Sequence, residues 1–272
     1  MVILNNVIYL HYSPRNLVVN DAGLNDKPLN QPTILNTIYE AVIFDMDGVI
    51  INSKDHVEAF WLEKLDEHGI HVPEEEREKR FHGKPARPTV NDLFSELDES
   101  TREKIIKECA IYDASVESYP MIPGVDAFIK QCVETGVRIG LVTSALPGKV
   151  DCMLAGLSLT TNPFEVMVTA DLVTNGKPDP ECYLLAAEKM GIHPGKMIVF
   201  EDSVSGVKAA SDAGATVLGI NEKQFADPLF DSGAQNLLHD FGNQQIKAGN
   251  GELRLITNGL KGRDEFRISN NY

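Results

Sequence analysis

Two aspartates separated by one residue stand at the end of an apolar run in residues 41–49, Ala-Val-Ile-Phe-Asp-Met-Asp-Gly-Val. The apolar residues favour a buried strand, and alternation along that strand aims Asp45 and Asp47 the same way at its carboxyl end. Ligands of open α/β sheets bind at this end of the strands. The pair therefore suits magnesium-dependent phosphoryl transfer, although a strand that ends at a simple Asp-Gly turn fits this fragment equally well.

Three later segments place further polar residues where strands are expected to end. One strand leads to Thr143 and Ser144, whose hydroxyls and neighbouring N–H groups can hold phosphate oxygens. Lys177 stands in a rigid loop between a glycine and a proline and can neutralise phosphate charge. Another apolar strand leads to Glu201 and Asp202. Taken singly, these residues have ordinary explanations as helix caps or a surface lysine, but on one sheet edge they are expected to form one site.

The acidic residues of this set predict a magnesium site. Mg²⁺ prefers oxygen ligands and is usually held by one or two carboxylates together with substrate phosphate. The carboxylates of Asp45 and Asp202 with the backbone carbonyl of Asp47 would satisfy that preference. Glu201 is a further candidate, either as a ligand or as a residue that supports the ligands.

The elements that must position these residues follow from hydrophobic periodicity. Helices are expected over residues 123–136, 147–157, 180–190 and 203–213, and strands over 138–142, 166–169, 197–200 and 216–220. Alternation of strand and helix predicts an α/β fold with a doubly wound parallel sheet.

A block of helical patterns separates the first strand from the rest of this sheet. Ser53 is expected to cap the first helix, and further helices are expected over 74–81, 89–97 and 100–118. The block predicts an all-helical cap, residues 54–119, inserted into a core formed by residues 38–53 and 120–258. Residues 1–37 are expected to be an N-terminal extension and residues 259–272 a C-terminal tail, with a late strand or hairpin around 253–256.

Composition narrows the function classes. The formal net charge of -15 opposes non-specific binding to nucleic acid or to an anionic membrane, since both need clustered Lys and Arg. The four cysteines are widely spaced and form no Cys-x-x-Cys pair, which argues against a zinc site or a disulfide framework. The first ten residues make a poor signal peptide. We therefore expect a cytoplasmic monomer without a nucleic-acid or membrane partner.

Four motifs in order resemble the haloacid dehalogenase superfamily of phosphatases and phosphomutases. They are Phe-Asp-Met-Asp-Gly-Val at 44–49, Val-Thr-Ser at 142–144, Gly-Lys-Pro-Asp-Pro at 176–180 and Phe-Glu-Asp-Ser-Val-Ser-Gly at 200–206. The resemblance covers residues 38–238 and implies a Rossmann-like core, a helical cap, magnesium and an aspartyl-phosphate intermediate.

The resemblance also implies a role for each motif residue. Asp45 would be the nucleophile and Asp47 the general acid and then base. Thr143 and Lys177 would bind the transferring phosphate. Asp202 would hold magnesium with Asp45 and the backbone of Asp47.

Within the superfamily, short segments resemble sugar-phosphate and polyol-phosphate phosphatases. The cap segment Phe-His-Gly-Lys-Pro at 81–85 is similar to a His-Gly segment of those enzymes, and His82, Lys84 and Arg87 are expected either to reach the substrate or to form a solvated surface. The leading hypothesis is a magnesium-dependent phosphatase of a small sugar or polyol phosphate. The alternatives are a phosphomutase similar to beta-phosphoglucomutase and a non-catalytic phosphosugar-binding protein, whereas Asp47 argues against a dehalogenase.

Overall fold

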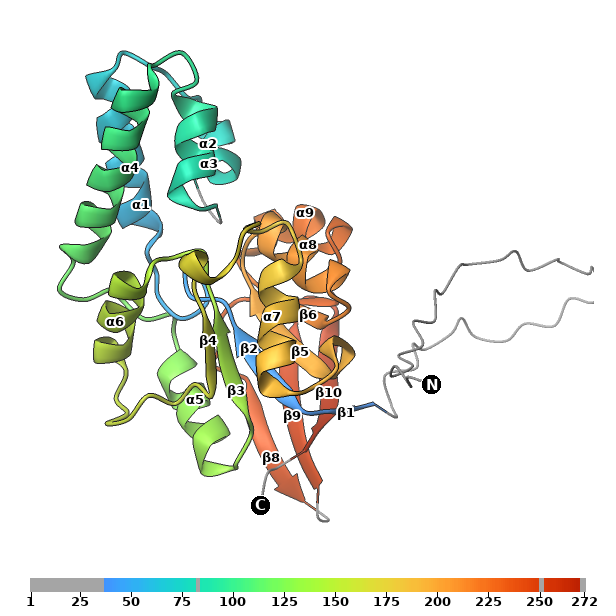
Figure 1. Ribbon diagram of the computed structural model, residues 1–272. Helices are drawn as coiled ribbons and strands as arrows, with labels where there is room; N and C mark the ends of the chain where they lie inside the picture. The colour runs from blue at the N-terminus through green and yellow to red at the C-terminus, as the bar shows by residue number, and fades with distance from the viewer. Residues whose placement is uncertain (1–36, 82–83, 250–251, 270–272) are drawn as a thin grey trace, which may run out of the picture. The chain divides into compact units, whose positions relative to one another are not determined.

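The computed structural model describes residues 37–81, 84–249 and 252–269. A parallel sheet of six strands forms the core, in the order β4-β3-β2-β5-β6-β7 (Figure 1). The strands are β2 (Ala41–Phe44), β3 (Ile139–Val142), β4 (Val166–Val168), β5 (Met197–Glu201), β6 (Thr216–Ile220) and β7 (Asn236–Leu238). Because β2 pairs with β3 on one side and with β5 on the other, the residues that follow β2 emerge from the middle of the sheet.

Helices cover both faces of this sheet. They are α5 (Val125–Glu134) and α6 (Pro147–Gly156) on one face, and α7 (Glu181–Met190), α8 (Val204–Asp212) and α9 (Ala226–Asp231) on the other. Successive side chains of β2 alternate between the faces, so Phe44 packs in the cluster with α5 and α6, while Ile43 packs in the cluster with α7 to α9. Short 3-10 turns η2 (Ala170–Leu172), η3 (Pro194–Lys196) and η4 (Lys223–Phe225) join these elements. The predicted doubly wound α/β fold is confirmed.

Four helices are inserted between β2 and the core helix α5, as the sequence predicted. They are α1 (Lys54–Glu67), α2 (Glu74–Phe81), α3 (Ala86–Leu93) and α4 (Glu99–Ala114), and we call them the helical insert. The insert has its own apolar cluster, in which Phe60, Trp61 and Phe94 are buried. The third helix begins at Ala86 rather than at residue 89, because a proline such as Pro88 is tolerated in the first turn of a helix.

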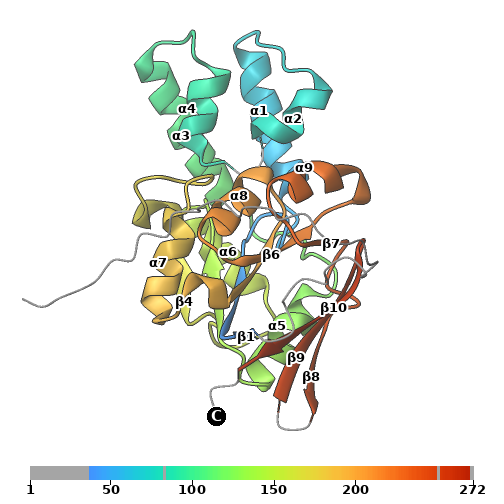
Figure 2. The same cartoon turned by 90° about the vertical axis from the view of Figure 1, so that its right-hand side faces the viewer.

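The end of the chain differs from the expected tail. A second sheet has the order β1-β10-β9-β8, and consists of β1 (Ile38–Tyr39), β8 (Gln245–Gly249), β9 (Glu252–Gly259) and β10 (Gly262–Ile268). Residues 262–268 are a strand because Phe266 and Ile268 are buried on one face, with the chain turned back by Gly262 at φ +101°. The views in Figures 1 and 2 place this sheet and the helical insert at opposite ends of the core.

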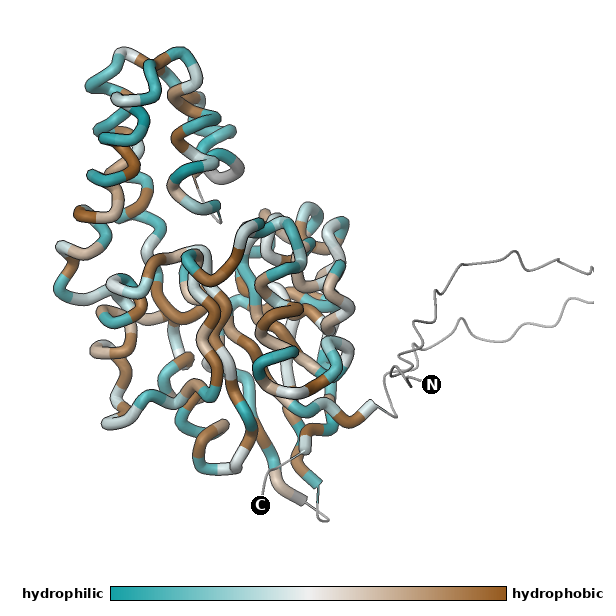
Figure 3. The backbone as a smooth tube through the Cα atoms, in the orientation of Figure 1, coloured by the Kyte–Doolittle hydropathy of each residue, from teal (hydrophilic) through white to brown (hydrophobic). Residues whose placement is uncertain are grey.

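Hydropathy along the backbone agrees with this layered arrangement. Figure 3 shows the central strands as hydrophobic and the helices as mixed, with hydrophilic stretches on the insert. Within the described part of the chain, no helix combines the length and the apolar character needed to cross a bilayer.

Candidate active site

Asp45 and Asp47 lie directly beyond the central strand β2. The N–H of Asp45 donates to the carbonyl of Phe200 at 3.0 Å, so pairing with β5 continues as far as Asp45. The side chain of Met46 is buried, and its carbonyl accepts a hydrogen bond from the N–H of Ile50 at 2.8 Å, which turns the chain into a tight loop. Both carboxylates line one cavity, as their spacing predicted, but they contact different partners.

Lys177 links Asp45 to a second buried carboxylate. Its ammonium Nζ lies 2.5 Å from Asp45 Oδ1 and 2.5 Å from Glu201 Oε1, and it also donates to the carbonyl of Val142 at 3.2 Å. Burial opposes the charge of Lys177, but the two carboxylates outweigh it and raise the lysine pKa. The pKa of Asp45 is raised as well, because burial and the neighbouring acids outweigh this single shared cation.

Glu201 is completely buried and anchors Lys177. Its Oε1 accepts hydrogen bonds from Lys177 and, at 2.9 Å, from the hydroxyl of Tyr183. Its Oε2 accepts from the backbone N–H of Asp202 at 3.0 Å, and from the N–H and the hydroxyl of Ser203, both at 3.2 Å. Since protein donors already occupy both oxygens, the geometry favours a supporting role for Glu201 over direct metal ligation.

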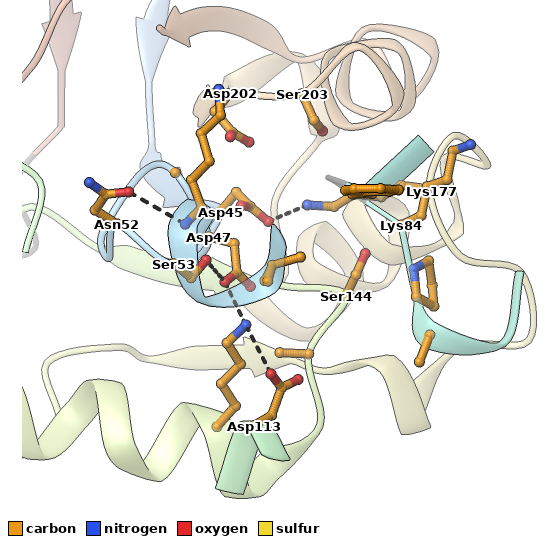
Figure 4. Close-up of a pocket in the computed structure, with 18 of the residues that line it drawn as sticks. Asp45, Asp47, Asn52, Ser53, Lys84, Asp113, Ser144, Lys177, Asp202 and Ser203 are labelled. Atoms are coloured by element: carbon orange, nitrogen blue, oxygen red, sulfur yellow. Dashed lines mark hydrogen bonds and ion pairs between the residues drawn. The ribbon is translucent and has the colours of Figure 1, made fainter. Parts of the chain in front are cut away.

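The residues present fit a divalent cation. Oxygen atoms of Asp45, Glu201 and Asp202 lie within 4.8 Å of one another, and Figure 4 shows Asp202 and Asp45 on the same side of the cavity. Burial and the nearby acids raise the pKa of Asp202, so a cation bound between these carboxylates would favour its ionised form. Gly48 has φ +76°, and a Cβ built there would lie 1.9 Å from Asp202 Oδ2. The glycine therefore lets this carboxylate approach the loop, and the hard oxygen donors suit Mg²⁺.

Asp47 contacts a different cation, one that the sequence analysis did not identify. Lys149, on α6, places its Nζ 2.7 Å from Asp47 Oδ1, and the hydroxyl of Ser53 donates to the same oxygen. Burial opposes ionisation of Asp47, but Lys149 and Ser53 outweigh it and lower the pKa. Ser53 does occupy the N-cap position of α1, yet its hydroxyl makes no capping bond and instead serves Asp47. No sequence signal distinguished Lys149 from other helix lysines.

The two hydroxyl residues after β3 have separate environments. Thr143 is 4% exposed, and its Oγ1 accepts a hydrogen bond from the backbone N–H of Ala145 at 3.0 Å. Ser144 lines the cavity, where Figure 4 shows it between Asp47 and Lys84. Of the two predicted phosphate-binding hydroxyls, the structure therefore places that of Ser144 at the cavity.

The cavity has a volume of about 680 Å³ and extends from the core to the helical insert. Lys84 and Arg87, two of the three cap residues considered as substrate contacts, line it, while His82 lies outside the described residues. Arg87 also forms an ion pair with Glu103 on α4. Much of the insert wall is apolar, and includes Val57, Phe60, Trp61, Phe81 and Ile106.

Comparisons with known proteins agree with this geometry. Residues 42–220 match the family described as haloacid dehalogenase-like hydrolase. The chain is 31% identical to validoxylamine A 7'-phosphate phosphatase of Streptomyces hygroscopicus subsp. limoneus, over 71% of this chain and 90% of the relative. It is 34% identical to a phosphorylated carbohydrates phosphatase of Thermotoga maritima, over 64% of this chain and 82% of the relative. In fold it is similar to beta-phosphoglucomutase from Clostridium difficile, with a TM-score of 0.64 at 20% identity over 75% of this chain and 92% of that one.

Proposed function

This chain belongs to the haloacid dehalogenase-like hydrolases and is a phosphoric monoester hydrolase, and we propose that it hydrolyses a small phosphorylated sugar or polyol with magnesium through an aspartyl-phosphate intermediate. The observation that carries the proposal is the placement of two differently paired aspartates in one cavity. Asp45 contacts Lys177 at 2.5 Å, and Asp47 contacts Lys149 at 2.7 Å. The pKa of Asp45 is raised and that of Asp47 lowered in the site without magnesium and substrate. Bound magnesium would favour the ionised Asp45 that a nucleophile needs, and the negative charge of a bound phosphate would favour the protonated Asp47 that a general acid needs.

In the first step, an oxygen of Asp45 forms a bond to phosphorus, and the bond between phosphorus and the substrate oxygen breaks. Asp47, entering this step protonated, gives its proton to the departing alkoxide, which leaves as an alcohol. Lys177 holds Asp45 in place and offers positive charge beside the transferring group. The result is a phosphorylated Asp45 and an ionised Asp47.

In the second step, water attacks the phosphorus and Asp47 takes a proton from it. The bond between phosphorus and Asp45 breaks, which releases inorganic phosphate and restores the Asp45 carboxylate. Mg²⁺, held by Asp45, Asp202 and the backbone carbonyl of Asp47, would neutralise charge on the phosphoryl group.

The helical insert is proposed to act as the cap that selects the substrate. It contributes part of the cavity wall, where Lys84 and Arg87 offer cationic donors beside apolar side chains. A sugar or polyol phosphate is the proposed substrate class because the two phosphatase relatives are named for validoxylamine A 7'-phosphate and for phosphorylated carbohydrates. Action on free metabolites without a nucleic-acid partner accords with the net charge of -15.

Phosphate release from a panel of phosphorylated metabolites tests the proposal. The panel contains sorbitol 6-phosphate, 2-deoxyglucose 6-phosphate, glycerol 3-phosphate and glucose 1-phosphate, each assayed with magnesium and with chelator. Asp45→Asn should abolish turnover, whereas the control Asp151→Asn, an exposed aspartate on α6, should retain it. Turnover that survives Asp45→Asn would contradict the covalent mechanism.

Product analysis with glucose 1-phosphate separates the phosphatase from a phosphomutase. Both would use Asp45 and Asp47, but in a mutase a sugar hydroxyl rather than water accepts the phosphoryl group. Free phosphate is the expected product. Glucose 6-phosphate formed without free phosphate would instead establish the mutase, and binding without any turnover would establish a non-catalytic phosphosugar-binding protein.

A further inference from the structure

Lys149 is a buried lysine that none of the sequence motifs contains. It lies in the first turns of α6 and is only 5% exposed. Its Nζ lies 2.7 Å from Asp47 Oδ1, 3.9 Å from Asp113 Oδ1 and 5.3 Å from the centre of the Tyr119 ring. Burying an ammonium group is costly unless it is paired, so the fold maintains this contact against a substantial desolvation penalty.

The contacts of the Asp47 carboxylate are asymmetric. Lys149 and the hydroxyl of Ser53 both bind Oδ1, and among the described residues the structure gives Oδ2 no hydrogen-bond partner. The Asp47 side chain remains 30% exposed and lines the cavity. Two donors on one oxygen fix the rotation of the carboxylate and leave the other oxygen available to exchange a proton with substrate or water.

The same lysine contacts the connection that returns from the helical insert, and the outgoing connection meets the oxygen of Asp47 that the lysine holds. Ser53 immediately precedes α1, while Asp113 is in the last turn of α4 and Tyr119 is on the return segment. His56 of α1 completes the group, with Nε2 3.8 Å from Asp113 Oδ1. The position of Asp47 is therefore tied to the base of the insert through Lys149.

We propose that Lys149 is a positioning residue that holds Oδ1 of Asp47, so that Oδ2 faces the cavity and delivers the proton to the leaving alkoxide. This inference rests on the proposed phosphatase function. Lys149 itself forms no bond to the substrate and acts through Asp47. Loss of the lysine frees the carboxylate to rotate, so proton delivery is impaired while attack by Asp45 is not.

The test compares leaving groups. An alkyl phosphate such as sorbitol 6-phosphate or 2-deoxyglucose 6-phosphate releases a basic alkoxide that needs a proton, whereas p-nitrophenyl phosphate releases a stable phenolate that does not. The value of kcat/KM reports the barrier relative to free enzyme and substrate, so it isolates the first transfer from later hydrolysis of the phosphorylated enzyme. A general loss of structure would instead lower kcat/KM for both substrates equally.

Lys149→Met should lower kcat/KM for the alkyl phosphate by about 10- to 100-fold, part of the ~10²–10⁴-fold that general acid catalysis supplies. The value for p-nitrophenyl phosphate should fall by less than about 3-fold, because nucleophilic attack is preserved. In an Asp47→Asn background the same substitution should cause no further selective loss, since Lys149 acts only through Asp47. The proposal is overturned if Lys149→Met leaves unchanged the ratio of kcat/KM for the alkyl phosphate to kcat/KM for p-nitrophenyl phosphate.

Lys64→Met is the matched control. Lys64 is also a buried lysine, 8% exposed, and is paired with Glu67 at 2.9 Å and Glu108 at 3.1 Å, but it lies in the helical insert away from the aspartates. Lys64→Met should leave the ratio of kcat/KM for the two substrates unchanged. A ratio that falls equally in both lysine variants would also overturn the assignment.

Thermal unfolding of each variant establishes that it is folded. If Lys149→Met does not fold, Lys149→Gln, which keeps a polar group beside Asp47, should show the same selective loss of alkyl phosphate hydrolysis; equal losses on both substrates would count against the proposal. If the wild-type chain hydrolyses neither substrate, the proposed function itself fails. If it hydrolyses both and the lysine variants keep the wild-type ratio, only the role of Lys149 fails.

Discussion

Replacing Glu201 by glutamine should destabilise the fold by about 3 kcal/mol, the low end of the cost of breaking a buried ion pair. The glutamine oxygen can keep the hydrogen bonds to the backbone N–H groups of Asp202 and Ser203, but its NH₂ group then faces the ammonium of Lys177. A charge-assisted hydrogen bond of about 1.5–3 kcal/mol is lost, and two donors oppose each other. The cost stays at the low end because Lys177 retains Asp45 as a partner.

Urea unfolding at neutral pH, with chelator present, measures this change. Glu165→Gln is the matched control, because Glu165 also pairs with a cation, Arg138, but its side chain is 44% exposed. That substitution should cost less than about 1 kcal/mol, since solvent screens exposed pairs. A cost for Glu201→Gln as small as that of the control would refute the reasoning. So would a variant whose stability is unchanged but whose magnesium requirement rises steeply, because Glu201 would then be a ligand rather than the anchor of Lys177.

Three further outcomes follow from the structure. Gly48→Ala should raise the magnesium concentration needed for half-maximal activity by at least about 10-fold, because the new Cβ meets Asp202 Oδ2 at 1.9 Å. Gly191→Ala is the control, because Gly191 has a similar φ of +66° but nothing within 4 Å of the new Cβ. It should leave the magnesium requirement unchanged. The pKa of Asp47 is lower in the folded protein than in the unfolded chain, where it is about 4. The ion pair of Asp47 therefore stabilises the fold fully above about pH 4, and this stabilisation is lost as the pH falls through the pKa of the folded protein. In chelator, the stability lost in Asp47→Asn should thus be largest near neutral pH and shrink below about pH 4; a loss independent of pH would contradict it. Phe241→Ala should cost about 3–5 kcal/mol in urea unfolding, because its ring packs 5.0–6.0 Å from those of three other phenylalanines, and a loss under about 1 kcal/mol would show that the cluster relaxes around the gap.

The sequence predicted most of the core because each element repeats a simple signal. Apolar runs of strand length alternate with helical periodicity, and parallel strands place their carboxyl ends on one edge, so Asp45, Lys177 and Asp202 could be assigned to one site before the fold was known. The last strand was missed, although Phe266 and Ile268 carry the alternation that would have indicated it.

The partners of the site residues could not be predicted in the same way. A hydroxyl at a helix start normally predicts a cap, but Ser53 turns to Asp47 because a charged acceptor lies within its reach. Ser144 rather than Thr143 lines the cavity, and this choice depends on which hydroxyl the backbone of Ala145 engages. Such choices depend on atoms brought together from distant parts of the chain.

The sequence by itself determined the fold class, the order along the chain in which polar residues follow the strands, and the two aspartates proposed to carry the reaction. Only the tertiary structure decided how the charges are shared, with Lys177 between Asp45 and Glu201 and with Lys149 on Asp47. The physical reason is that periodicity and motif order are local properties of the chain, whereas the charge of a carboxylate depends on burial and on ions a few ångströms away.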